Sequence, residues 1–162
     1  MLSKILYSAP LVLFLFFTNR SVAQQLTNDS GSPFDSTQRV QKIVSEKSDA
    51  IIEYAKKFMG VPYVWGGMSP SGFDCSGFIN YVFKGFGFGL TRTSYGLAEL
   101  GKTVRLSELR PGDLMFFKAR NLNTTRVGHV ALVVDTTDGI IQFIHAASTG
   151  IRIDTFNNSS YY

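Results

Sequence analysis

The spacing of apolar residues changes once along this chain, and that change constrains the fold more than any other feature. Up to about residue 87, apolar side chains recur at the spacing of a helix face. From residue 114 onward, the apolar runs are short, partly alternating and bounded by turn residues, as in strands. These runs cover residues 114–119, 129–135, 139–147 and 150–156. Helices followed by consecutive strands predict an α+β domain with an antiparallel meander.

Two helices are predicted to open the folded part of the chain. The first follows an apolar stripe from Val40 to Val44. The second begins with a cap at Ser48 or Asp49 and stops at Gly60, because glycine readily adopts the left-handed conformation that ends helices. An extended segment over residues 61–67, closed by a Gly-Gly turn, follows the second helix. This segment leads towards the only cysteine of the chain.

The first 23 residues are predicted to form a signal peptide. Lys4 is followed by an apolar run over residues 5–17, which is too short to span a membrane comfortably. Ser21 and Ala23 place small residues where a signal peptidase cleaves, so we expect cleavage after Ala23. An uncleaved N-terminal anchor is the alternative. The sequence therefore predicts an exported protein, in the periplasm or outside the cell, with no stable membrane anchor after cleavage.

The remaining chain predicts a flexible, polar leader over residues 24–37 and one folded domain over residues 38–162. The hydrophobic fraction of 44% suits a packed core, which a chain with one cysteine needs because it has no disulfide framework. The net charge is +4, but Lys and Arg are dispersed, so nucleic-acid binding is not expected. A mildly basic surface could favour an anionic partner such as a cell wall or a membrane, although a solvated surface is the simpler explanation. We expect a monomer.

Cys75 is the only cysteine, so it cannot form a disulfide within the chain. It stands between a loop over residues 68–74 and a helix over residues 76–87, which ends at Gly85 or Gly87. Unpaired N–H groups and the helix dipole stabilise a thiolate at a helix start, so this position suits a nucleophile. The alternative is a buried cysteine that fills a gap in the core. The core face of this helix would carry Phe78, Tyr81 and Val82.

His129 and His145 are the only histidines, and both fall in predicted strands. Neighbouring strands could place the two imidazoles side by side. A cysteine nucleophile needs a base, and the base needs an orienting group, so Cys75, His129 and His145 could fill these roles. The alternatives are two structural histidines or a metal site. The intervals of 54 and 16 residues between the three do not resemble the short-spaced pairs of zinc sites, so no metal is predicted.

Five short motifs occur in order: Tyr-x-Trp-Gly-Gly at 63–67, Asp-Cys-Ser-Gly-Phe at 74–78, Pro-Gly-Asp-Leu with Phe-Phe at 111–117, Gly-His-Val-Ala at 128–131 and His-Ala at 145–146. Together they resemble the NlpC-type cysteine peptidases of bacterial cell walls, from about Ile51 to Phe156. The resemblance implies a papain-like α+β fold. In that fold N-terminal helices, with the helix that begins at the nucleophile, pack on a small antiparallel sheet that carries the histidines.

The resemblance also implies roles for individual residues. Cys75 would attack the peptide carbonyl, and His129 would act as the base and later as the acid for the leaving amine. His145 would be the third, polar member of the triad. Tyr63 would help to hold the oxyanion, although it could also be a partly buried core aromatic. The residues that match substrate-binding positions are Asp74, Ser76, Trp65, Arg92 and Ser94.

Some of these positions have simpler explanations. Asp74 could cap the helix with no further role, and Trp65 could shape the wall of the cleft. Thr91 stands where the family usually has proline, and Leu97 stands where it usually has glutamine. These departures concern the cleft and leave the nucleophile unchanged.

The resemblance implies an exported cysteine endopeptidase that hydrolyses the stem peptides of peptidoglycan, at the bond between γ-D-glutamate and the diamino acid. Attack by Cys75 would give a thioester, which water would hydrolyse, with no metal or organic cofactor. Two alternatives stay open. One is an amidase or acyl transferase that uses the same three residues on another exported amide, and the other is an inactive wall-binding module.

Overall fold

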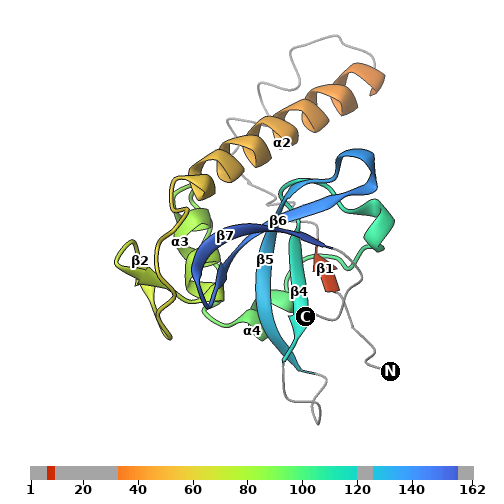
Figure 1. Ribbon diagram of the computed structural model, residues 1–162. Helices are drawn as coiled ribbons and strands as arrows, with labels where there is room; N and C mark the ends of the chain where they lie inside the picture. The colour runs from red at the N-terminus through yellow and green to blue at the C-terminus, as the bar shows by residue number, and fades with distance from the viewer. Residues whose placement is uncertain (1–6, 10–32, 120–125, 157–162) are drawn as a thin grey trace, which may run out of the picture.

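The computed structural model describes residues 7–9, 33–119 and 126–156 (Figure 1). The helices are α2 (Pro33–Lys56), α3 (Cys75–Lys84) and α4 (Ser94–Ala98), and the strands are β1 (Tyr7–Ala9), β2 (Met68–Ser69), β3 (Gly72–Phe73), β4 (Leu114–Lys118), β5 (Val127–Asp135), β6 (Ile141–Ala147) and β7 (Gly150–Phe156). Single 3₁₀ turns precede β4 and β6, at Leu106–Glu108 and Thr137–Gly139. The order of helices followed by a run of strands confirms the predicted α+β class.

The main sheet has the strand order β1-β4-β5-β6-β7, and all neighbouring strands are antiparallel. Its last four strands follow one another in the chain, so they form the predicted meander. Their bounds agree closely with the predicted runs, because turn residues mark where each strand ends. The tightest connection joins β6 to β7, where Ala147 pairs with Gly150. That pairing sets the register, so His145 lies directly opposite Arg152.

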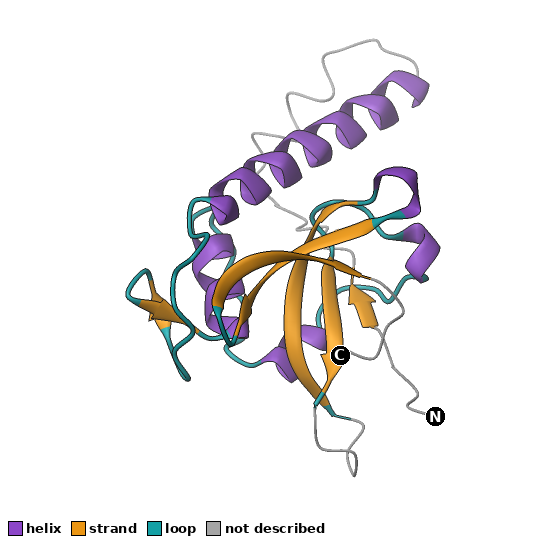
Figure 2. Cartoon of the chain, in the orientation of Figure 1, coloured by secondary structure: helices purple, strands orange, loops and turns teal. Residues whose placement is uncertain are grey.

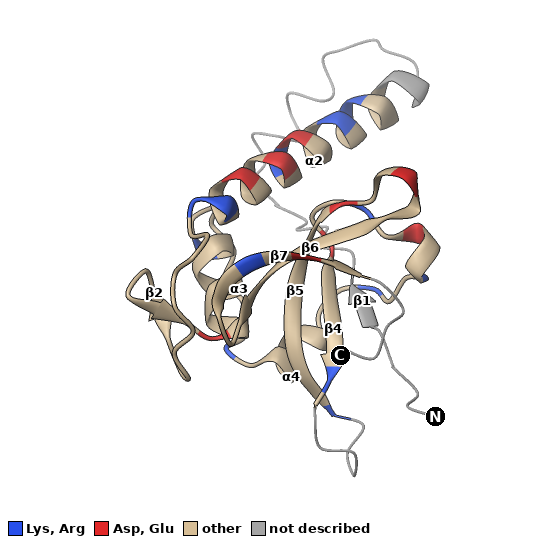
Figure 3. Ribbon diagram, in the orientation of Figure 1, with Lys and Arg blue, Asp and Glu red and all other residues tan. Residues whose placement is uncertain are grey.

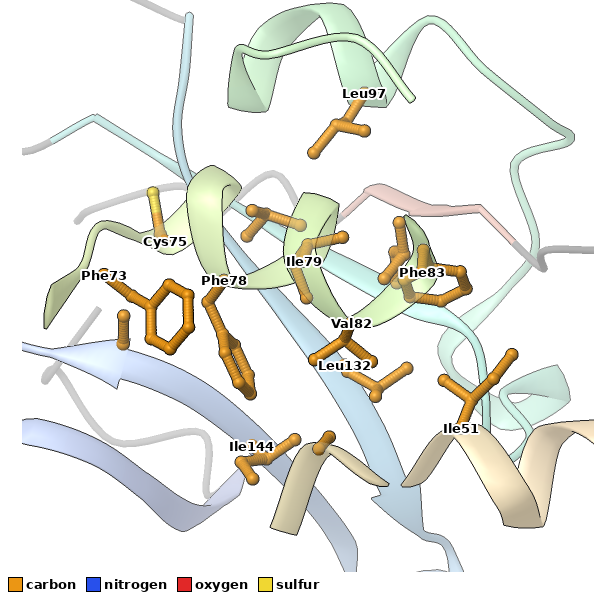
Figure 4. Close-up of a cluster of buried hydrophobic side chains, with 14 of the residues drawn as sticks. Ile51, Phe73, Cys75, Phe78, Ile79, Val82, Phe83, Leu97, Leu132 and Ile144 are labelled. Carbon is orange, nitrogen blue, oxygen red and sulfur yellow. The ribbon is translucent and has the colours of Figure 1, made fainter. Parts of the chain in front are cut away.

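One face of the sheet packs against α3 and the last turns of α2 (Figures 2 and 4). The side chains of this cluster include Ile51, Phe78, Ile79, Val82, Leu132 and Ile144. The predicted core face of α3 is confirmed, because Phe78 and Val82 are fully buried and Tyr81 packs against the same cluster. Burial of one such large apolar side chain contributes about 1.5–3 kcal/mol. The cluster therefore holds α3, and with it Cys75, in a fixed place against the sheet.

The opposite face of the sheet carries a second, smaller cluster. It includes Met115, Phe117, Ala131, Val133 and Phe143. Successive residues of a strand point to opposite faces, so His129 and His145 share this second face. Their ring contacts agree, since Phe117 lies 5.8 Å from His129 and Phe143 lies 5.1 Å from His145, between ring centroids. Aromatic packing therefore supports both imidazoles.

The prediction of two separate N-terminal helices is wrong, because Pro33–Lys56 forms a single helix. No glycine or proline interrupts residues 34–56, so neither Ser48 nor Asp49 begins a new helix. Apolar side chains in the first half of α2, such as Ile43, are exposed, and charged residues are spread along the helix (Figure 3). The last turns reach the core through Ile51, Ile52 and Ala55.

The start of α2 overlaps the end of the predicted leader. Residues 33–37 lie in the first turns of this helix. The physical reason is that proline fits the first turn of a helix, where its missing N–H is not needed. The leader residues 24–32 lie outside the described residues.

The short strand β1 lies within the predicted signal peptide and pairs with Leu114–Phe116 of β4. Without it, β4 would be an edge strand, whose unpaired N–H and C=O groups accept a further strand. The rest of the predicted signal peptide, including the cleavage site after Ala23, lies outside the described residues. Within the described ranges, no helix has both the length and the apolar character needed to span a membrane. Cleavage of the predicted signal peptide would leave β4 at the edge of the sheet.

Candidate active site

A short hairpin leads into α3 and replaces the loop predicted over residues 68–74, because β2 and β3 pair with each other there. Two glycines allow this hairpin to pack closely. A β-carbon on Gly67 would lie 2.4 Å from the carbonyl oxygen of Gly72, and a β-carbon on Gly77 would lie 2.0 Å from that of Gly67. Larger residues at these two positions would push the hairpin away from the first turn of α3.

Asp74 caps α3 in the way that its position suggested. Its backbone is extended, with φ −92° and ψ 176°, and its Oδ1 accepts a 2.7 Å hydrogen bond from the N–H of Gly77. Cys75 is therefore the first residue of the helix. The Cys75 side chain is buried, and its sulfur points away from the rings of Phe73 and Phe78 (Figure 4).

The environment of Cys75 favours the protonated thiol. Burial raises the pKa of Cys75, and the charge of Asp74 raises it further. The neighbouring backbone N–H groups of Val130, Ser76 and Cys75 act to lower this pKa, but they do not offset burial. Burial therefore acts against the thiolate that the helix start was expected to stabilise. The thiol needs a base before it can act as a nucleophile.

The two imidazoles lie side by side, as predicted. His129 Nε2, from β5, lies 2.8 Å from His145 Nδ1, from β6, and the rings meet edge to face at 82°. His145 is only 2% exposed, whereas His129 is half-buried. The backbone N–H of Val130, the residue after His129, is close enough to the Cys75 sulfur to lower the pKa of the thiol, so the sulfur lies near β5 at this point. His129 is thus the histidine next to the thiol along β5, and His145 lies behind it.

Asp154 extends this line of groups by one member. His145 Nε2 lies 3.0 Å from Oδ2 of Asp154, on β7. The other oxygen, Oδ1, accepts a 2.7 Å hydrogen bond from Nε of Arg152 and a second bond from Nη2 of the same side chain. Burial lowers the pKa of His145, and the charge of Arg152 acts in the same direction, while Asp154 opposes them. His145 is therefore neutral at neutral pH.

The sequence analysis did not single out Asp154, although a signal was present. Ser148 and Thr149 form a two-residue connection between β6 and β7, and such a connection fixes the register of a hairpin. In that register Arg152 lies opposite His145, and Asp154 occupies the diagonal position two residues further on. The pairing of the strands, and not the spacing in the sequence, brings this carboxylate to the imidazole.

A second cluster joins three of the predicted substrate-binding residues. Arg92 donates from Nη2 to Asp74 Oδ2 at 2.6 Å, from Nη1 to Asp74 Oδ1 at 3.0 Å, and from Nη1 to Ser76 Oγ at 2.9 Å. The N–H of Gly66 also donates to Asp74 Oδ2, at 3.0 Å. Burial acts to raise the pKa of Asp74, but the guanidinium and the N–H groups outweigh it and hold this pKa below its usual range. Asp74 is therefore an ionised and well-satisfied cap.

Tyr63 stands next to this cluster, on the segment that pairs with β3. It forms an isolated bridge with Phe73 and is half-buried. Burial raises the pKa of its hydroxyl, and the nearby charges of Cys75 and Asp74 raise it further. The hydroxyl is therefore a hydrogen-bond donor beside Cys75. This arrangement is consistent with both the oxyanion role and the partly buried aromatic role that the sequence left open.

The two other predicted substrate-binding residues lie in different settings. Ser94 is buried as the first residue of α4, whose N-terminal cap is Thr93. Trp65 is 88% exposed, in the turn before β2, where it is available to form the wall of a cleft. Thr91, one of the departures from the family pattern, anchors its segment by accepting a 2.9 Å hydrogen bond from Asn80 of α3. Among the described residues, no group of three or more His, Cys, Asp or Glu is arranged to hold a metal ion.

Residues 60–162 match the model of the NlpC/P60 family, so the chain belongs to this family. A similar protein is the gamma-D-glutamyl-L-lysine dipeptidyl-peptidase of Bacillus subtilis (strain 168), with 38% identity over 107 residues. That alignment covers 66% of this chain and 34% of the relative, so the chain spans about a third of the enzyme it matches.

Two solved structures support the same assignment. The NlpC/p60 domain of peptidoglycan hydrolase SagA is 34% identical, with a TM-score of 0.55, over 68% of this chain and 88% of that domain. RipD from Mycobacterium tuberculosis, described as a non-catalytic NlpC/p60 domain protein adapted to peptidoglycan binding, is 26% identical, with a TM-score of 0.57, over 68% of this chain and 88% of that chain. The predicted papain-like domain of the NlpC type is therefore confirmed.

Proposed function

We propose that this domain is an exported cysteine endopeptidase that cleaves the stem peptides of peptidoglycan. The single observation that carries the proposal is the 2.8 Å contact between His129 of β5 and His145 of β6, with Val130, the residue after His129, beside the sulfur of Cys75. The Bacillus subtilis relative is named for the γ-D-glutamyl-L-lysine unit, so we propose the bond between γ-D-glutamate and the diamino acid as the target. The predicted signal peptide supports action in the periplasm or at the cell wall.

In the proposed reaction, His129 removes the proton of Cys75, and the sulfur attacks the carbonyl carbon of the γ-D-glutamyl amide. The hydroxyl of Tyr63 and the backbone N–H of Cys75 would donate to the oxyanion. His129 then gives its proton to the leaving amine of the diamino acid, which leaves an acyl group on Cys75 as a thioester. A water molecule, deprotonated by His129, attacks the thioester, and the thiol regains its proton as the acid product departs.

The cluster of Asp74, Ser76 and Arg92 would hold the N-terminal part of the stem peptide. Arg92 remains about a third exposed while it is paired with Asp74, so it can offer charge to a ligand without losing its partner. Ser94 would keep the start of α4 in place, and Trp65 would form part of the wall. The reaction needs no metal or organic cofactor, and the domain would act as a monomer.

An inactive wall-binding module is the second candidate, because RipD is described as non-catalytic. The contact between His129 and His145, next to the residue whose N–H neighbours the Cys75 sulfur, favours an enzyme, since binding alone does not require a thiol and two paired imidazoles. An amidase or acyl transferase would use the same groups on another amide. These possibilities differ in their products.

Cleavage of defined stem peptides separates the candidates. The purified protein and its Cys75→Ala variant are incubated with stem peptides that contain either diaminopimelate or lysine, and the products are read by mass spectrometry. We expect a fragment with a new N-terminal diamino acid from the intact protein alone. If the thiol reacts with iodoacetamide but no stem peptide is cleaved, the substrate is another amide. An inert thiol and no cleavage would support the binding module.

A further inference from the structure

The line from Asp154 through His145 to His129 has a consequence for the position of protons. We propose that Asp154 is a positioning residue that fixes which ring nitrogen of His129 carries a proton. This inference rests on the proposed function, because it concerns the base of the same reaction.

The carboxylate of Asp154 is paired with Arg152. Arg152 donates twice to Oδ1 of Asp154, and a guanidinium at this distance favours the ionised acid. An ionised carboxylate only accepts hydrogen bonds. His145 Nε2, 3.0 Å from Oδ2, must therefore carry a proton.

The second step passes through His145. This imidazole is buried, and its lowered pKa leaves it with a single ring proton. With that proton on Nε2, the other nitrogen, Nδ1, holds a lone pair and accepts. His129 Nε2, 2.8 Å away, must then be the donor. Neutral His129 consequently has its lone pair on Nδ1, and in the proposed reaction this nitrogen would take the proton of Cys75.

Arg152 determines which oxygen of Asp154 accepts the hydrogen bond from His145. It holds Oδ1, so Oδ2 remains for His145, and the carboxyl group is not free to exchange its two oxygens. Arg152 is itself about half exposed, so its charge is partly solvated and the imidazole keeps the buried side of the carboxylate. Because the thiol of Cys75 is protonated, a base with its lone pair on the wrong nitrogen would leave the nucleophile inactive.

The variant Asp154→Asn tests this directly, since it changes two atoms and keeps the shape. Arg152 would retain the amide oxygen, which would turn the amide NH₂ towards His145 Nε2. His145 would then carry its proton on Nδ1, His129 would accept at Nε2, and the His129 proton would move to Nδ1, the nitrogen that acts as the base in the proposed reaction. We expect kcat to fall by about 10²–10⁴-fold, the range of general-base catalysis, with little change in KM. Asp135→Asn removes a carboxylate near the other end of β5 and is the matched control.

The decisive readout is the protonation of the two rings, by ¹⁵N NMR of the full chain labelled at histidine. The chain contains only two histidines, so two imidazoles appear in the spectrum. We expect both rings of the unsubstituted protein to be protonated at Nε2 and not at Nδ1. We expect Nδ1 protonation on both in Asp154→Asn and no change in Asp135→Asn. Nδ1 protonation in the unsubstituted protein would overturn the inference, even if the variant failed to fold.

The two proposals fail in different ways. Rings protonated as expected, without cleavage of any stem peptide, would contradict the proposed function and leave the positioning role of Asp154 standing. An active protein whose imidazoles keep the same protonation in Asp154→Asn would contradict the positioning role alone.

Discussion

Two aspartates of this domain each form an ion pair with an arginine, and the two aspartates have different roles. Asp74, at the start of α3, accepts hydrogen bonds from Arg92 and from the N–H groups of Gly66 and Gly77. Asp154, on β7, gives one oxygen to Arg152 and the other to His145. The first carboxylate is surrounded by groups that fix the fold. The second leaves one oxygen for a titratable ring, so it can control where a proton lies.

The contrast shows that two Asp–Arg ion pairs near one active site can act on different groups. The charge of Asp74 raises the pKa of Cys75, so this cap acts against thiolate formation. Asp154 acts on the base instead of the nucleophile. Substitutions in the two regions should therefore separate stability from turnover.

The largest effect is expected on the histidine side. His129→Ala removes the base, so we expect kcat to fall by about 10²–10⁴-fold. The apparent pKa for alkylation of Cys75 by iodoacetamide should rise, since no imidazole would be left to accept the proton. The control is Asp135→Asn, which should behave as the unsubstituted protein. An unchanged alkylation profile would remove His129 from the role of base.

On the α3 side, Tyr63→Phe tests the oxyanion donor. Loss of one such donor costs about 10²-fold or more in kcat. Alkylation of Cys75 should be nearly unaffected, because the hydroxyl is not needed to deprotonate the thiol. Steady-state kinetics and alkylation rates are compared for the same samples. Full turnover in Tyr63→Phe would show that Tyr63 is a structural aromatic.

Substitutions of Asp74 should act on stability and on the thiol in opposite ways. Asp74→Ala removes the cap, and capping alone is worth about 0.5–2 kcal/mol of the free energy of unfolding. Asp74→Asn keeps a capping oxygen but removes the charge, so it should lose less stability and lower the pKa of Cys75. Urea unfolding and the pH dependence of alkylation measure the two effects. Equal destabilisation by both variants would contradict the capping role.

The smallest effect is a pH dependence of stability. The pKa of Asp74 is lower in the folded protein than its value of about 3.9 in an unfolded chain. Its contribution is therefore complete above the unfolded pKa and is lost as the pH falls through the folded pKa. Arg92→Ala should bring the loss of stability to a higher pH, as urea unfolding from pH 7 to acid would show. Lys102 is an exposed cation elsewhere in the domain, so Lys102→Ala should leave the loss of stability at acid pH unchanged.

The sequence was most informative where local patterns decide the structure. Alternation and turn residues predicted β4 to β7, and the two histidines, predicted to lie side by side on neighbouring strands, do so. The sequence patterns failed where the local structure depends on residues that are close in space. Residues 68–74 form a hairpin because glycines allow close packing, and the first two predicted helices merge into α2 because nothing interrupts them.

The chemical state of the site was harder to predict than its members. The helix start suggested a stabilised thiolate, which would have a lowered pKa. Burial instead raises the pKa of Cys75, and burial is a property of the assembled core. Asp154 was missed because its role comes from the register between β6 and β7. Both features depend on contacts between segments far apart or paired in the sheet, which single-sequence patterns do not contain.

The central claim is that Cys75 forms a covalent acyl intermediate, and rapid acid quenching followed by intact-protein mass spectrometry tests it most directly. The protein is mixed with a stem peptide and quenched before turnover is complete. We predict an adduct on Cys75 with the mass of the N-terminal acyl fragment, removed by hydroxylamine and absent from Cys75→Ala. Cleavage that continues in Cys75→Ala, with no adduct in either protein, would contradict the claim.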